Sequence, residues 1–223
     1  LYDAFGKQVK RLRKSDIQDV SMVSNGQLFE DNRLKIAQFA YAQYPYTVEF
    51  SYETVVYNTM AYPVWDVQID NEVSIEKATF TVNMPTGTEL RYREEHLLKG
   101  VVISNTTTGK QYTWQLTSLP TFEWNAHLTP TVYTTATDFE VEGYKGSMRS
   151  WADIGKFFYD LNEGRDELPE ANKQKVLQLV SNEKTPAAKV KKLYEYMQAN
   201  TRYVGVQLGI GGWQTIPATT VAE

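Results

Sequence analysis

Two histidines, His96 and His127, are the side chains of this 223-residue chain whose ordinary pKa suits proton transfer near neutral pH. Neither has a second imidazole at the spacing of a zinc site, and Glu94 is the one acidic neighbour on the expected strand face of His96. The sequence holds no Gly-x-Ser-x-Gly motif and no cysteine, so it supplies no recognisable serine or thiol nucleophile. We therefore expect no catalytic residue, no metal site and no cofactor in this chain.

Two other groups of residues resemble ligand sites in composition alone. Asp66, Asp70 and Glu72 offer oxygen ligands for calcium, but the glycine-containing loop that wraps such an ion is missing, which favours a polar turn. The segment Gly209–Gly212 lacks the Gly-Lys-Ser/Thr ending of a phosphate-binding loop, which favours a flexible loop.

Alternation of polar and apolar residues dominates from about residue 5 to 146 and is broken by turn residues, a pattern typical of an antiparallel β-sandwich-like domain. In Thr47–Tyr57, the clearest example, every second residue is apolar or Thr, and we expect a strand with one buried face. Further strands are expected at Ala78–Met84, ahead of a Pro-Thr-Gly-Thr turn, and at Thr131–Tyr144. Val101–Ser104 and Gln111–Leu119 are expected to be two strands joined by a polar loop.

Helical periodicity replaces alternation near residue 150. Helices are expected from Ser150 to about Asn162, from Pro169 to Val180, from Thr185 to Asn200 and from Pro217 onward. A strand is expected between the last two, over Arg202–Leu208. These elements predict the α+β class, with a β domain over 1–147, a linking helix over 148–166 and a small helical segment over 167–223. Because the last helix is cut in its first turns, we expect the natural protein to continue.

The composition indicates a folded protein and excludes one class of partner. A formal net charge of -4 disfavours nucleic acid, and the basic run Lys7–Lys14 is interpreted as a solvated strand face. The sequence contains no run of about 18 apolar residues, so it predicts no membrane-spanning helix. The sequence begins at Leu1-Tyr2-Asp3 without a charged-then-apolar leader pattern, and we expect any signal peptide to have been removed or to lie outside this sequence.

Several motifs support a family resemblance over nearly the whole chain. They are Glu30–Arg33, the segment Tyr57–Asp70 with Pro63 and Trp65, and Ser150–Asp153. These stretches resemble the bacterial domain-of-unknown-function family numbered 3857, which commonly precedes transglutaminase-like domains in exported proteins of Bacteroides-like bacteria. The order from Thr185 to Glu223 looks like the start of a transglutaminase-like core, which has a papain-like thiol fold.

This resemblance implies that 167–223 is the N-terminal part of a transglutaminase-like domain, truncated before the Gly-Asp-Cys motif that carries the nucleophile. It implies a thiol protease or acyl transferase in the full-length protein, an inactive fragment here, and a periplasmic or extracellular location. Residues ahead of the nucleophile often line the cleft in this fold, so Tyr203, Gln207 and Trp213 are the candidates for substrate contact or oxyanion support. Alternatively, Tyr203 and Trp213 pack against the missing half of the core, and Arg202 is a structural ion-pair partner.

Three functions remain open at this point. The chain is the non-catalytic region of such a protein, with a β domain that positions a peptide, protein or glycan substrate. Alternatively, it is a carbohydrate- or peptide-binding β-sandwich module with no enzymatic partner, which its 15 tyrosines allow. The third alternative is a structural adaptor whose aromatic residues all lie in the core. The sequence does not define the oligomeric state.

Overall fold

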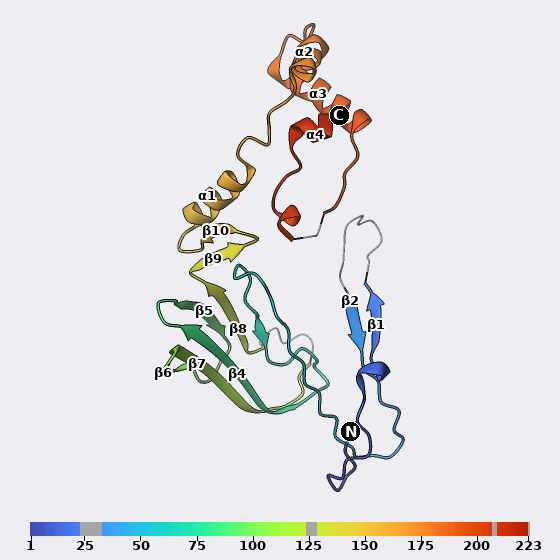
Figure 1. Cartoon of the computed structure of the whole chain (residues 1–223), viewed down its shortest axis with the longest axis vertical. Coiled ribbons are helices and arrows are strands. Elements are labelled where there is room, and N and C mark those ends of the chain that lie inside the picture. Colours follow the sequence, from blue (N-terminus) through green and yellow to red (C-terminus); the bar gives the residue numbers. More distant parts are fainter. Residues whose placement is uncertain (23–32, 124–128, 207–208, 223) are drawn as a thin grey trace. The chain divides into compact units, whose positions relative to one another are not determined.

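The computed structural model describes residues 1–22, 33–123, 129–206 and 209–222, and it confirms the α+β class. The chain divides into two compact units, one from Val56–Leu161 and the other from Leu1–Val55 together with Asn162–Glu223. Figure 1 labels the helices and strands of both units. The division into domains expected from the sequence stays a prediction, because compactness alone does not define a domain boundary.

The unit Val56–Leu161 contains two facing antiparallel sheets over its described residues. One sheet has the order β4-β7-β6, with β4 Ile75–Pro85, β7 Gly109–Leu119 and β6 Val102–Thr106. The other has the order β3-β8-β5, with β3 Trp65–Asp66, β8 Thr131–Ala136 and β5 Leu90–Glu95. The predicted strands at 78–84, 101–104 and 111–119 are therefore confirmed, with bounds shifted by a few residues.

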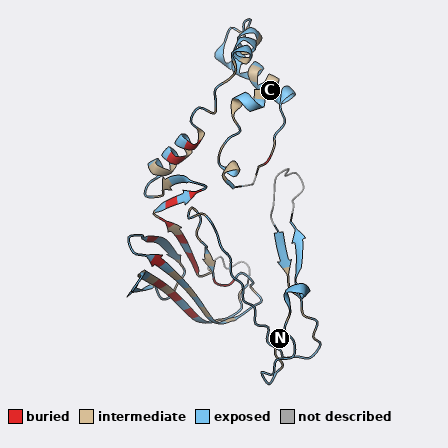
Figure 2. Cartoon of the chain, in the orientation of Figure 1, coloured by how far each residue is buried: buried red, intermediate tan, exposed pale blue. Residues whose placement is uncertain are grey.

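The core of this unit lies between the two sheets. Met84, Tyr112 and Trp114 come from one sheet, and Leu90 and Val132 from the other. The Phe80 ring stacks between those of Trp65 and Trp114, at centroid distances of 5.6 and 5.5 Å. Figure 2 shows buried residues gathered on these strands. Alternation thus places every second side chain in a common aromatic core, which is the physical basis of a sandwich.

The strand expected over Thr131–Tyr144 is broken into three, and the expectation of one long strand is wrong. Beyond β8, strands β9 Asp138–Val141 and β10 Tyr144–Ser147 form a separate hairpin. Glu142 and Gly143 have φ values of 47° and 87°, which allow the tight turn between them. Helix α1, Trp151–Asn162, packs Phe157 against Phe139 of this hairpin with ring centroids 4.9 Å apart.

The strand expected over Thr47–Tyr57 is not formed, and that prediction is wrong. Thr47 makes an isolated bridge to Tyr2, and the remainder of the segment lies outside every described strand. Phe50 and Tyr52 are 72% and 79% exposed. Alternation indicates a strand only where a partner strand satisfies the backbone and a core covers the apolar face, and the described residues provide neither here.

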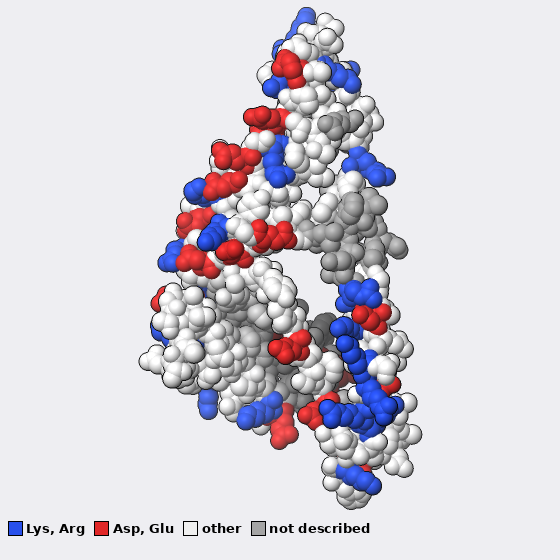
Figure 3. Space-filling model, in the orientation of Figure 1, with Lys and Arg blue, Asp and Glu red and all other residues white. Residues whose placement is uncertain are grey.

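In the first 55 residues, the helix η1 Lys14–Asp16 precedes a hairpin of β1 Gln18–Ser21 and β2 Arg33–Ile36. Residues 7–14 are exposed apart from half-buried Leu12, as expected for a solvated basic run, but they form no strand. Figure 3 shows basic side chains gathered over this N-terminal segment.

The C-terminal part contains α2 Glu170–Leu179, α3 Pro186–Asn200, the short helix η2 Gly209–Gly212 and α4 Ala218–Ala222. Thr185 caps α3 by accepting the Ala188 N–H at 3.2 Å, and Lys175 of α2 lies 4.9 Å from the Tyr196 ring of α3. Residues 201–205 have no regular structure and Val206 makes one isolated bridge, so the strand expected over Arg202–Leu208 is absent from its described part. No helix in the described residues is long and apolar enough to cross a bilayer.

Candidate functional site

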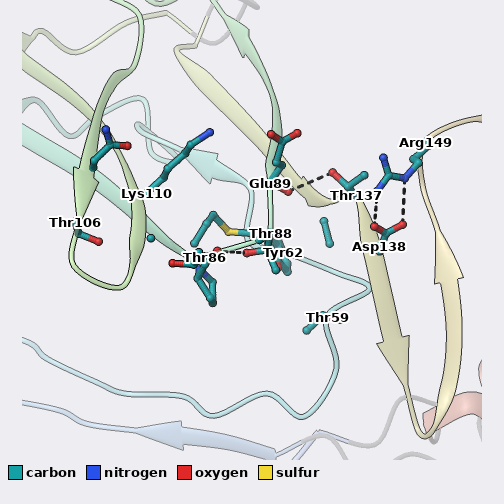
Figure 4. Close-up of a pocket in the computed structure, with 16 residues that line it drawn as sticks. Thr59, Tyr62, Thr86, Thr88, Glu89, Thr106, Lys110, Thr137, Asp138 and Arg149 are labelled. Atoms are coloured by element: carbon teal, nitrogen blue, oxygen red, sulfur yellow. Dashed lines mark hydrogen bonds and ion pairs between the residues drawn. The ribbon is translucent and has the colours of Figure 1, made fainter.

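A cavity of 780 Å³ opens where several strands of the Val56–Leu161 unit end. The turn after β4 and the turn between β6 and β7 form one side, and the end of β8 and the start of β9 form another (Figure 4). Thr59 and Tyr62, which precede β3, also line it. Five threonine hydroxyls line the cavity, contributed by Thr59, Thr86, Thr88, Thr106 and Thr137.

One hydrogen bond joins the two turns, and another stabilises the turn after β4. The N–H of Thr86 donates to the carbonyl of Thr108 at 2.9 Å, and the Thr88 hydroxyl donates to the carbonyl of Pro85 at 2.7 Å. Gly109 begins β7 with a φ of 149°, at a place where a Cβ would overlap the Met84 carbonyl. The conformation of this wall therefore depends on local hydrogen bonds and on the absence of a side chain at Gly109.

Asp138 and Arg149 form a two-point ion pair on the opposite wall. Arg149 Nη2 donates to Asp138 Oδ2 at 2.6 Å, and Nε donates to Oδ1 at 3.3 Å. These hydrogen bonds favour the charged carboxylate and hold the pKa of Asp138 below its ordinary value of 3.8. Asp138 is therefore an anion at neutral pH and is unsuited to act as a general acid.

Two further charged side chains line the cavity without a direct polar contact to another described side chain. The Glu89 carboxylate and the Lys110 ammonium make no side-chain hydrogen bond or ion pair with the described chain. Together with the threonine hydroxyls of the lining, they offer both acceptors and donors to a polar ligand. None of the described lining residues is a histidine or a cysteine.

The residues predicted from the sequence as substrate contacts lie in the C-terminal part. Tyr203 is 92% exposed in the irregular stretch 201–205. Trp213 is 48% exposed and donates its backbone N–H to the Ile210 carbonyl at 2.9 Å. Gln207 lies outside the described residues. A role in substrate contact stays a prediction for all three.

Sequence reasoning does not reveal this cavity. The sequence indicates turns at Thr86, Thr88 and Thr106. The shared richness of these turns in Thr is the one signal that could have pointed to a site, and the structure places both turns at the same end of the sandwich. The pairing of Asp138 with Arg149 has no such signal, because it depends on the register of the β9–β10 hairpin.

This arrangement defines an α+β protein with a cavity at one end of a β-sandwich, lined in part by hydroxyl and charged groups. Residues 1–123 match the family described as "Domain of Unknown Function with solved-structure structure (DUF3857)", and the chain belongs to this family. The resemblance expected from the sequence is confirmed in this respect. No curated protein sequence matches the chain.

One similar solved structure is the crystal structure of a "putative protease" from Parabacteroides distasonis ATCC 8503. The similarity covers 72% of this chain and 31% of that one, at 16% sequence identity and a TM-score of 0.44. This chain therefore spans less than a third of that protein's length.

Proposed function

We propose that this chain is the non-catalytic N-terminal region of an exported, transglutaminase-like thiol protease or acyl transferase. In this proposal the unit Val56–Leu161 positions a peptide substrate, and the helices from α2 onward begin the catalytic core. Membership of the DUF3857 family and the resemblance of the segment from Thr185 to Glu223 support the proposal. The chemistry itself belongs to a cysteine outside this sequence, since the chain has none.

The observation that carries the binding role is the pair of opposite charges in the cavity that form no ion pair within the described chain. The Glu89 carboxylate can accept and the Lys110 ammonium can donate hydrogen bonds in this 780 Å³ cavity, so a peptide amide and a charged side chain would both find partners there. The same cavity contains no thiol, so a substrate would be held without being cleaved.

Two experiments test these points separately. The coding sequence beyond the Glu223 codon is expected to contain a cysteine within the next helix, with histidine and aspartate further on. A longer reading frame without that cysteine would refute the enzymatic part. For the binding role, Lys110→Gln is expected to weaken capture of peptides on an array, while Lys77→Gln, which removes a charge from β4 outside the cavity, is expected to leave capture unchanged.

A carbohydrate-binding module is the second candidate function. The threonine hydroxyls and Tyr62 in the cavity lining favour it, because sugars bind through hydroxyl networks and aromatic faces. A glycan array separates the two functions. Binding to glycans that is lost in Lys110→Gln, with no binding to peptides, would favour the carbohydrate function.

A further inference from the structure

A second cavity, of 530 Å³, lies on the outer face of the β3-β8-β5 sheet and is distinct from the cavity at the strand ends. Arg91 and Arg93 of β5 lie opposite Thr135 and Tyr133 of β8, and these four residues share the face that Trp151 of α1 borders. Arg149 lines both cavities. Among the described lining residues none is acidic, so the surface is basic and aromatic.

The two arginines of β5 differ in their ion pairing. Arg93 donates to Glu95 at 2.7 Å and lies 4.7 Å from the centre of the Tyr133 ring. Arg91 makes no side-chain hydrogen bond or ion pair with any described residue, although it lines the same cavity. A guanidinium that forms no ion pair with the described residues is available to an anionic side chain.

The backbone of β5 is also available on one side. β5 is an edge strand, paired with β8 alone. The backbone of Arg91–Glu95 forms no further hydrogen bond within the described residues, so its outward N–H and C=O groups are open. Edge strands of this kind accept an extended peptide as an added strand.

Trp151 supplies an apolar contact at the rim of the same face. It is the first residue of α1 and is 88% exposed, and it lines the cavity together with Arg91. An exposed indole that lines the same cavity as the Arg91 guanidinium matches a ligand that carries both an apolar and an acidic side chain.

We propose that β5 binds an extended acidic peptide segment by strand addition. The peptide backbone pairs with the open edge of β5, one acidic side chain reaches Arg91, and a neighbouring apolar side chain packs on Trp151. Side chains two positions apart fall on the same face of an added strand, so the motif has an acidic and an apolar residue at i and i+2. The site is independent of the peptide-positioning role assigned to the Glu89–Lys110 cavity.

The test uses the whole 223-residue chain and a fluorescein-labelled octapeptide in which Glu and Val fall on the same strand face. Fluorescence anisotropy is expected to show saturable binding, and replacement of Glu by Gln in the peptide is expected to weaken it about threefold to fivefold. N-methylation of alternate peptide nitrogens, which keeps every charge but removes backbone donors, is expected to weaken it about tenfold or more.

Variants of the chain then locate the site. Arg91→Gln is expected to reproduce the loss seen with the Gln peptide, whereas Lys77→Gln, the same charge change on the edge strand β4, is expected to bind normally. Equal loss in both variants would mean diffuse electrostatic attraction and would overturn the proposal. Undiminished binding of the N-methylated peptide would overturn strand addition.

An acidic glycan is the alternative ligand, and oligogalacturonate is the probe for it. If oligogalacturonate binds and the peptide does not, and if Arg91→Gln abolishes that binding, the ligand is an acidic glycan and the peptide proposal is overturned. Retained peptide binding in Lys110→Gln with loss in Arg91→Gln would separate this site from the proposed function.

Discussion

The indole Nε1–H of Trp114 donates a 2.7 Å hydrogen bond to Oε1 of Glu94, and the two side chains join the two sheets of the sandwich. Trp114 is 0% exposed, so this N–H has no access to water. The same carboxylate oxygen accepts the Val101 N–H at 2.9 Å. A single acidic side chain thus satisfies the polar atom of the largest core residue and fixes the loop after β5.

Glu94→Ala is expected to lower the free energy of unfolding by about 1–3 kcal/mol, because the buried indole N–H loses its acceptor. Glu94→Gln keeps a carbonyl acceptor and is expected to cost less. Urea unfolding followed by circular dichroism measures both variants. Equal stability of the Ala and Gln variants would show that the Trp114 N–H finds another partner.

The ion pair of Asp138 and Arg149 predicts a loss of stability in acid. Because the pKa of Asp138 is lowered in the folded chain, the pair stabilises the fold above the ordinary carboxyl pKa. That contribution is lost as the pH falls through the lowered value. NMR titration of the Asp138 carboxyl is expected to show a midpoint below 3.8 in the native chain and a higher midpoint in Arg149→Gln. An unchanged midpoint would show that the pair is not formed in solution.

Replacement of glycine by alanine is expected to have opposite effects on stability at Gly109 and at Gly155. Gly109→Ala is expected to destabilise the chain by about 1–3 kcal/mol, since its Cβ would overlap the Met84 carbonyl at the wall of the first cavity. Gly155 lies within α1, where an added Cβ would meet no atom within 4 Å, so Gly155→Ala is expected to stabilise by about 0.5–1 kcal/mol. Thermal unfolding of the two variants side by side checks the signs, and a stabilising Gly109→Ala would contradict the turn geometry.

The elements that the sequence predicts well are those with local signals. Helix α3 follows from the Thr185 cap and the Pro186 start, and β4 and β7 follow from the alternation over Ala78–Met84 and Gln111–Leu119. Where partners are distant, local patterns fail. Thr47–Tyr57 alternates as well as β4 does, yet it finds no partner strand among the described residues, and no local pattern reveals that difference.

The candidate site is less predictable than the fold for the same reason. Its walls come from segments between Thr59 and Arg149, and they meet because of the order of strands in two sheets. Glu89 and Lys110 are ordinary strand-end residues in the sequence, and only their common cavity makes their charges notable. The edge position of β5, on which the acidic-peptide site depends, likewise follows from the sheet order alone.

Trp151 has the most exposed indole among the described tryptophans, so we expect it to contribute most to the quenchable tryptophan fluorescence, ahead of Trp213, which is 48% exposed. Trp151 is 88% exposed, whereas Trp114 is 0% exposed, so iodide is expected to reach the first and not the second. Trp151→Phe is therefore expected to reduce the iodide-quenchable fraction of the emission clearly, with little change in stability because the indole covers no core surface. Stern–Volmer plots of the native chain and the variant measure this fraction, and urea unfolding checks that the variant is folded. An unchanged quenchable fraction would mean that Trp151 is covered in solution, and it would remove the apolar contact on which the proposed peptide motif depends.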